Sequence, residues 1–222
     1  IRQTGGFLDV QSTVGKGTLA IPMTAPATAF SYTVQVLEGQ VGTAFVRASA
    51  TGFSPDSTAL TAVQPGLDII FLTTSLTTFS PNDPFSVRVG IPNGQNTGLQ
   101  QEQVLRAGSP GVLASVTSSA PAIGAIVSKA GSSGSATDSI VALTARTPQT
   151  TAALGGLEFD PLIGGTTTVS ATIPGFLAMP AATVTVNITA PAITISSPTV
   201  GAGLQIGASA SFGAAAPAGG VQ

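Results

Sequence analysis

Cysteine, histidine and tryptophan are absent from this chain of 222 residues. Without histidine and cysteine, the chain cannot build a Ser-His-Asp or Cys-His catalytic arrangement or the usual zinc sites. The lack of cysteine also excludes disulfides, but it assigns no compartment, since many exported bacterial proteins lack cysteine as well. We therefore expect a protein that is not an enzyme and that holds no metal ion and no cofactor.

Charge is scarce as well. Charged residues make up only 7% of the chain, and the formal net charge is -2. This composition gives no basic surface for nucleic acid and no attraction to an anionic membrane. No run of about 18 apolar residues occurs, so we expect no membrane insertion. The nine acidic residues stand singly in expected turns and edges, which argues against a catalytic carboxylate pair and a calcium loop.

Residues 161–222 contain no Asp, Glu, Lys or Arg at all, whereas an ordinary soluble surface is about 25% charged. The surface of this part must consist of Thr, Ser, Ala and Gly. Such a surface is tolerated where it packs against other subunits or carries glycans. We therefore expect the chain itself to be the main partner, with glycans as a second candidate.

Most of the chain has the pattern of short β-strands. Apolar and polar residues alternate between clusters of Gly, Pro, Asn and Asp, as in half-buried strands. The expected strands include residues 17–23, 30–37, 41–50, 58–63, 67–72, 85–91, 112–117, 124–128, 138–145, 155–159, 192–195 and 204–212. One helix is expected at residues 97–107, capped by Thr97, with Leu99, Val104 and Leu105 facing inward. The fold class is therefore predicted to be all-β.

A stretch in the first third of the chain recurs near its end, with two separations. Val46, Gly52 and Phe53 recur 123 positions later at Val169, Gly175 and Phe176, and Pro65, Leu67 and Ile69 recur 126 positions later at Pro191, Ile193 and Ile195. A fixed period of this kind is typical of a tandem array. The two equivalent phenylalanines are expected to pack at the ends of their domains.

The repeat predicts three segments. Residues 1–65 are the C-terminal part of a β-sandwich, residues 66–191 a complete sandwich with an insertion at 93–111, and residues 192–222 the opening strands of the next sandwich. The expected linkers are Pro65-Gly66 and Ala190-Pro191, where proline restricts the angle between domains. We thus expect a circularly permuted repeat unit with partial domains at both ends.

The two ends of the chain fit one another. When Gly220-Val221-Gln222 is followed by Ile1-Arg2-Gln3, the alternation continues in phase. The chain is then either one period of a longer repetitive polypeptide, or a subunit that completes its neighbour by strand donation. A head-to-tail contact that does not close produces a filament. The residues expected at this junction are Leu204, Ile206, Phe212, Val221, Gln222, Ile1, Arg2, Phe7 and Val10.

Several motifs extend over essentially the whole chain: ASATGF, SATIPGF, FSVRVGIPN after SPNDP, TVGAGLQIGASASFGAAAPAGGVQ and FSYTVQVLEGQVGTAFVRASATGF. In these motifs the chain resembles the bacterial immunoglobulin-like (Big-type) tandem repeats of large secreted or cell-surface proteins. The resemblance implies tandem immunoglobulin-like sandwiches and a structural role outside the cell or at its surface.

We expect the repeating unit of an extracellular filament. The alternative is an adhesin stalk or a ligand-binding accessory module of a secreted protein, against which the lack of tryptophan argues.

Overall fold

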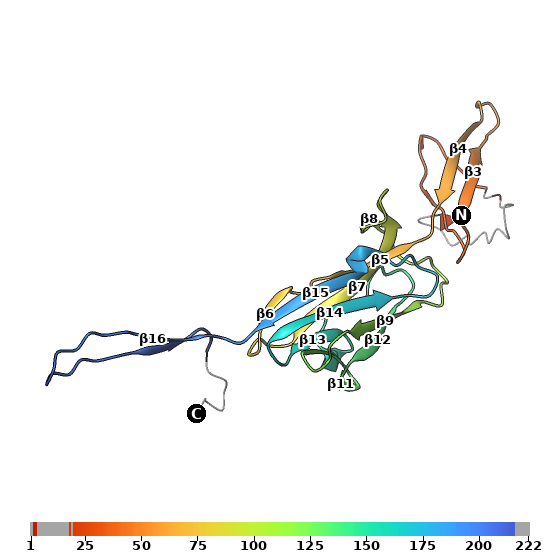
Figure 1. Cartoon of the computed structure of the whole chain (residues 1–222). Coiled ribbons are helices and arrows are strands. Elements are labelled where there is room, and N and C mark those ends of the chain that lie inside the picture. Colours follow the sequence, from red (N-terminus) through yellow and green to blue (C-terminus); the bar gives the residue numbers. More distant parts are fainter. Residues whose placement is uncertain (1, 4–17, 19, 216–222) are drawn as a thin grey trace. The chain divides into compact units, whose positions relative to one another are not determined.

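The computed structural model describes residues 2–3, 18 and 20–215 (Figure 1). The chain divides into two units, Ile1–Gln64 and Pro65–Gln222. The all-β prediction is confirmed, since the described residues form strands and only two short 3-10 turns, η1 (Ala152–Leu154) and η2 (Pro180–Ala182). Within the described ranges, no helix is long and apolar enough to cross a membrane.

The first unit contains two separate antiparallel pairs. β1 (Arg2–Gln3) pairs with β2 (Tyr32–Thr33), and β3 (Gly42–Ala48) forms a hairpin with β4 (Asp56–Ala62). The strand expected at residues 30–37 shrinks to the two residues of β2, and residues 20–23 of the strand expected before it have no strand structure. An isolated pair of strands is marginally stable in water, so neither pair encloses a core.

The second unit contains two larger sheets. The first has the order β11–β10–β13–β7–β5, with β8 also paired to β7, and the second has the order β12–β9–β14–β15–β6. The strands of the first sheet are β5 (Gly66–Ile70), β7 (Asp83–Pro92), β8 (Leu99–Glu102), β10 (Gly124–Ser128), β11 (Gly131–Ser133) and β13 (Leu157–Pro161). Those of the second are β6 (Ser75–Thr77), β9 (Val112–Ser118), β12 (Ser135–Ile140), β14 (Gly165–Thr172) and β15 (Thr183–Thr189). β15 pairs antiparallel with β14 and parallel with β6.

The two sheets share one hydrophobic core, and we call residues 66–189 the two-sheet body. Phe85, Val87 and Val89 of β7 are fully or almost fully buried, as are Val169 of β14 and Val186 of β15. The alternate residues of β7 face away from this core, which is the period-two pattern that the sequence predicts.

Two buried hydroxyls of the two-sheet body, those of Ser118 and Thr167, are paired, whereas the buried Ser86 hydroxyl has no hydrogen-bond partner among the described residues. The Ser118 hydroxyl donates to the Gly124 carbonyl at 2.6 Å and lies 2.9 Å from the Thr167 hydroxyl. Thr167 also accepts a hydrogen bond from the Ala120 N–H at 3.0 Å. These contacts join β9, β14 and the start of β10.

The prediction of a helix at residues 97–107 is wrong. β8 pairs with β7 on both sides of a register shift at Ile91/Pro92, and the following residues continue along the sheet. The Gln103 N–H donates to the Val89 carbonyl at 3.2 Å, and the Leu105 N–H donates to the Thr144 carbonyl at 2.8 Å. The segment thus satisfies backbone groups of β7 that a separate helix would leave unpaired, and Val104 is exposed rather than inward.

A further hairpin follows the two-sheet body. β16 (Ile193–Ile195) pairs antiparallel with β17 (Ala210–Phe212), which is shorter than the strand expected at residues 204–212. It belongs to the second of the two units. The division of the chain into three domains, with boundaries after residues 65 and 191, stays a prediction.

Candidate functional site

The hairpins that precede and follow the two-sheet body in the sequence are the strongest candidate for a functional site. We call β3–β4 the N-terminal hairpin and β16–β17 the C-terminal hairpin. Each repeats the strand register of a hairpin or strand pair inside the two-sheet body, and each leaves apolar side chains exposed. These two features, the repeated register and the exposed apolar side chains, define the surfaces.

The N-terminal hairpin has the register of β14–β15. All six residue pairs between β14 and β15 have a counterpart between β3 and β4 when β14 is numbered back by 123 and β15 by 126. For example, Val46 pairs with Thr58 as Val169 pairs with Val184. The two hairpins are therefore equivalent in register as well as in sequence.

The turn that leaves β3 also matches the turn that leaves β14. Gly52 has a φ of 84° and Gly175 a φ of 83°, a region that glycine adopts without strain. The Phe53 N–H donates to the Ala50 carbonyl at 3.2 Å, and the Phe176 N–H donates to Ile173 at 3.1 Å. The equivalence thus extends to the backbone of the turn.

The C-terminal hairpin has the register of β5–β7. Its three pairs are Ile193 with Phe212, Thr194 with Ser211, and Ile195 with Ala210. They correspond to Leu67 with Val89, Asp68 with Arg88, and Ile69 with Val87. The separations are again 126 for the first strand and 123 for the second, so both hairpins fit the same repeat.

Equivalent residues differ sharply in exposure. Ile193 is 62% exposed, whereas its equivalent Leu67 is 1% exposed, and Phe212 is 54% exposed against 2% for Val89. Phe53 is 79% exposed, while Phe176 packs against the core. The hairpins thus present to solvent the positions that are buried in the two-sheet body.

The residues predicted to form the junction are only partly described. Leu204, Ile206 and Phe212 are exposed, as a contact surface requires. Arg2 belongs to β1. The remaining predicted junction residues, Ile1, Phe7, Val10, Val221 and Gln222, lie outside the described residues. Phe53, Ile193 and Ile195 were not among the predicted junction residues, although the repeat itself would have found them through their buried equivalents.

The predicted linkers differ from one another. The Pro65 carbonyl accepts a hydrogen bond from the Leu177 N–H at 2.8 Å, and Gly66 is buried at the start of β5. Pro65 is therefore hydrogen-bonded to the two-sheet body, and Gly66 is its first residue, so this pair is not a free spacer. Ala190 is exposed and Pro191 half-buried directly after β15.

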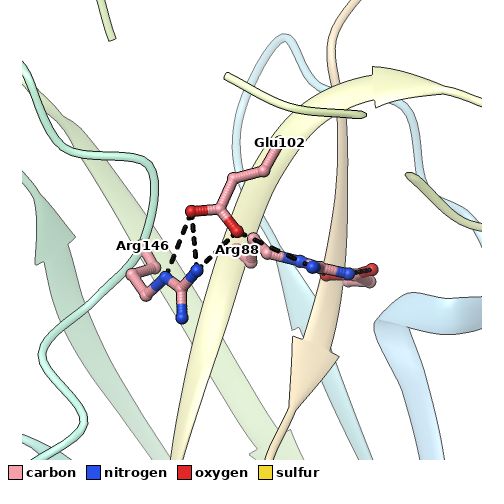
Figure 2. Close-up of polar contacts among 4 residues, drawn as sticks. Arg88, Glu102 and Arg146 are labelled. Carbon is pink, nitrogen blue, oxygen red and sulfur yellow. Dashed lines mark hydrogen bonds and ion pairs between the residues drawn. The ribbon is translucent and has the colours of Figure 1, made fainter. Parts of the chain in front are cut away.

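A charged cluster crosses the outer face of the first sheet (Figure 2). The Arg88 guanidinium donates to both Asp68 carboxylate oxygens, at 2.9 and 2.6 Å, which raises the pKa of Arg88 above its usual value. Glu102 contacts both arginines: it lies 3.6 Å from Arg88 and accepts hydrogen bonds from Arg146 at 2.6 and 2.7 Å. The guanidinium of Arg146 also lies over the Phe71 ring, 5.9 Å from its centroid.

This cluster acts structurally. Its two acids and two arginines are mutually compensated, and they tie β5, β7, β8 and the segment around residue 146 together. In the C-terminal hairpin, Thr194 and Ser211 stand at the positions of Asp68 and Arg88, and their hydroxyls lie 2.7 Å apart. The ion pair is thus specific to the two-sheet body.

Other surfaces offer little chemistry. A recess of about 690 Å³ is lined mostly by Ser, Thr and Gly, with Lys129 as its one charged residue. In the described part of the chain, no group of three or more His, Cys, Asp or Glu could hold a metal ion. Asp138 lies on edge strand β12, and burial raises its pKa, opposed by a hydrogen bond from the Ser139 N–H.

No protein-family model matches the chain, and no curated protein matches it. The interpretation of the two hairpins therefore depends on their geometry and on the internal repeat.

Proposed function

We propose that this chain is the structural repeat unit of an extracellular filament, built head-to-tail from immunoglobulin-like domains. One observation carries the proposal. The N-terminal hairpin has the register of β14–β15, and the C-terminal hairpin has the register of β5–β7. The two hairpins are therefore different, complementary parts of one sandwich, and two copies of the chain together supply both parts.

The strand order of the two-sheet body supports the immunoglobulin-like part of the proposal. In the constant-type immunoglobulin arrangement, one sheet holds strands A, B, E and D, and the other holds C, F and G. β5, β7, β13 and β10 follow one another in the first sheet as A, B, E and D do. β9, β14 and β15 follow one another in the second sheet as C, F and G do. By the same correspondence, the C-terminal hairpin is an A–B pair and the N-terminal hairpin an F–G pair.

The exposed apolar side chains supply a driving force for association. Burying one Ile or Phe side chain contributes about 1.5–3 kcal/mol, and Phe53, Ile193, Ile195 and Phe212 are all exposed. Together they would contribute on the order of 6–12 kcal/mol, which is comparable to the roughly 4–15 kcal/mol lost in immobilising two partners. Association through these residues is therefore feasible but concentration-dependent.

The connections to the hairpins leave the two-sheet body at opposite ends, which favours an open chain of copies. Pro65 is hydrogen-bonded to Leu177, just before η2 and β15, whereas Ala190 follows the last residue of β15. A strand of this length extends for about 20 Å. Contacts at opposite ends propagate, whereas contacts at one end tend to close a dimer.

The absence of charge over residues 161–222 also favours assembly, since no like charges oppose a second copy there. The extracellular location is inferred from the resemblance to bacterial immunoglobulin-like repeats alone. The function would be mechanical, with load passing from one sandwich to the next.

Sedimentation velocity and negative-stain electron microscopy of the purified chain, over a range of concentrations, would test the proposal. Elongated oligomers that grow with concentration are expected. Ile195→Ser should reduce assembly, because Ile195 is exposed on the C-terminal hairpin while its equivalent Ile69 is buried in the core. A chain that remained monomeric at every concentration would refute the proposal.

Leu154→Ser provides a matched control. Leu154 is as exposed as Ile195 but lies in η1 of the two-sheet body. The Leu154→Ser substitution removes an exposed aliphatic side chain, as Ile195→Ser does, but from a surface that takes no part in the proposed contact. Assembly should therefore be unchanged, and an equal loss in both variants would point to non-specific hydrophobic association.

A further inference from the structure

We infer that the C-terminal hairpin of one copy binds the N-terminal hairpin of a second copy in one defined register, in which Ala192 lies opposite Ser54. This inference rests on the proposed function and specifies its contact. It commits to a second copy of this chain as the partner. It follows from a contact inside the two-sheet body whose two sides recur on different hairpins.

The internal contact joins the start of β5 to the turn after β14. Gly66 and Leu177 form a parallel bridge, and the Leu177 N–H donates to the Pro65 carbonyl at 2.8 Å. The repeat separations of 126 and 123 convert Pro65, Gly66 and Leu177 into Pro191, Ala192 and Ser54. The Ser54 N–H of one copy should therefore donate to the Pro191 carbonyl of the other.

Both backbone groups are available for this bond. Within the part of the chain that the structure describes, neither the Ser54 N–H nor the Pro191 carbonyl has a backbone partner. Ser54 is exposed and directly follows Phe53, the aromatic whose equivalent packs on the core. Docking in this register would cover Phe53 together with the apolar side of the C-terminal hairpin.

The internal contact at Gly66 and the proposed contact at Ala192 differ on both of their sides, and the two differences support the same register. At Gly66, a Cβ atom would lie 2.6 Å from Met179 Cε and 2.9 Å from its sulfur, so a larger residue there would force the flexible end of the Met179 side chain to shift. The equivalent position, Ala192, carries a Cβ. The turn that would face it is three residues shorter, because Phe53 precedes Ser57 by four positions whereas Phe176 precedes Thr183 by seven.

The shorter turn contains neither η2 nor a methionine. The space that Met179 fills in the two-sheet body is therefore open to the methyl group of Ala192. The C-terminal hairpin has a methyl group where β5 has none, and the N-terminal hairpin lacks the segment that would collide with it. This is the relation expected of two surfaces in contact.

Disulfide trapping would test the register, and the absence of native cysteine gives a clean background. Ala192→Cys and Ser54→Cys would be purified as separate single variants, mixed and mildly oxidised. Neighbouring strands lie about 4.8 Å apart, within the range that a disulfide spans. Because each variant has one cysteine, any disulfide joins two copies. A dimer containing one copy of each variant is expected on a non-reducing gel and by mass spectrometry.

Thr194→Cys mixed with Ser54→Cys is the register control. Thr194 is equivalent to Asp68, on the outer face of the first sheet, so this pair should cross-link at least tenfold less. Each variant alone should form few homodimers.

The outcomes separate the two proposals. Assembly without the Ala192–Ser54 disulfide, or equal cross-linking of the Thr194 control, would overturn the register and leave the filament in place. No assembly of the unmodified chain would overturn both.

Discussion

Replacing Arg88 with methionine should destabilise the two-sheet body, because it leaves the Asp68 carboxylate buried with no cation beside it. The Asp68 side chain is only 8% exposed and the Arg88 side chain 28%. Removing one partner of a fully buried ion pair costs about 3–5 kcal/mol. Because Arg88 is partly hydrated, we expect a loss of about 2–3 kcal/mol in the free energy of unfolding.

The loss should be measured by urea unfolding and calorimetry. The chain has no tryptophan and its one tyrosine, Tyr32, lies in the first unit, so far-UV circular dichroism is the suitable probe of the two-sheet body. The expected decrease in Tm is roughly 4–12 °C. Arg47→Met removes an exposed arginine from β3 and should change this transition by less than about 0.5 kcal/mol.

The chain also supplies the design of a rescue variant. Changing Asp68 to Thr and Arg88 to Ser together copies the hydroxyl pair of Thr194 and Ser211. This double variant leaves neither charge of the pair unmatched, so it should be more stable than Arg88→Met. An effect of Arg88→Met below about 0.5 kcal/mol, or a double variant that is less stable than the single one, would contradict this reasoning.

Three further predictions concern the two-sheet body. Asp138 has a folded pKa above its ordinary value of 3.8, so its contribution to stability is greatest below that value and is lost as pH rises through the folded pKa. Asp138→Asn should therefore raise the free energy of unfolding more at pH 7 than at pH 3, by less than about 1 kcal/mol because the group is half-exposed. The same pH dependence of urea unfolding in the variant and the unmodified chain would contradict this. Gly90→Ala would drive a Cβ into the backbone of β8 and should cost about 1–3 kcal/mol in urea unfolding, whereas Gly94→Ala, with nothing within 4 Å, should be nearly neutral. Phe159→Ala removes a fully buried ring and should cost about 3–5 kcal/mol, whereas exposed Phe79→Ala should cost far less, as thermal unfolding of the two variants would establish.

Strand positions in the two-sheet body could be predicted well from the sequence because the core side chains alternate with polar ones. The segment from Phe85 to Ile91 is an example, since its inward residues Phe85, Val87 and Val89 are at most 2% exposed. The same reasoning failed at residues 97–107, where Thr97 as a cap and Leu99, Val104 and Leu105 as inward residues led to the prediction of a short helix. There, backbone groups of β7 that need partners override local periodicity.

The candidate site was only partly accessible from the sequence. The repeat identifies Ile193, Ile195 and Phe53, but their exposure depends on strands that the described chain does not place beside them. The charged cluster was missed. Asp68 and Arg88 lie at outward positions of two expected strands, so a correct pairing register would have brought them together. Arg146 comes from an irregular segment whose position follows from no local pattern.

The close packing of Met179 against Gly66 has a consequence for fidelity. In chains with similar repeats, a strand of one molecule can replace its counterpart in another, which entangles them. At the position of β5, the Ala192 methyl group of β16 would press against the end of the Met179 side chain, which would have to shift. Glycine on the native strand thus favours β5 over the hairpin strand of a neighbour at this position.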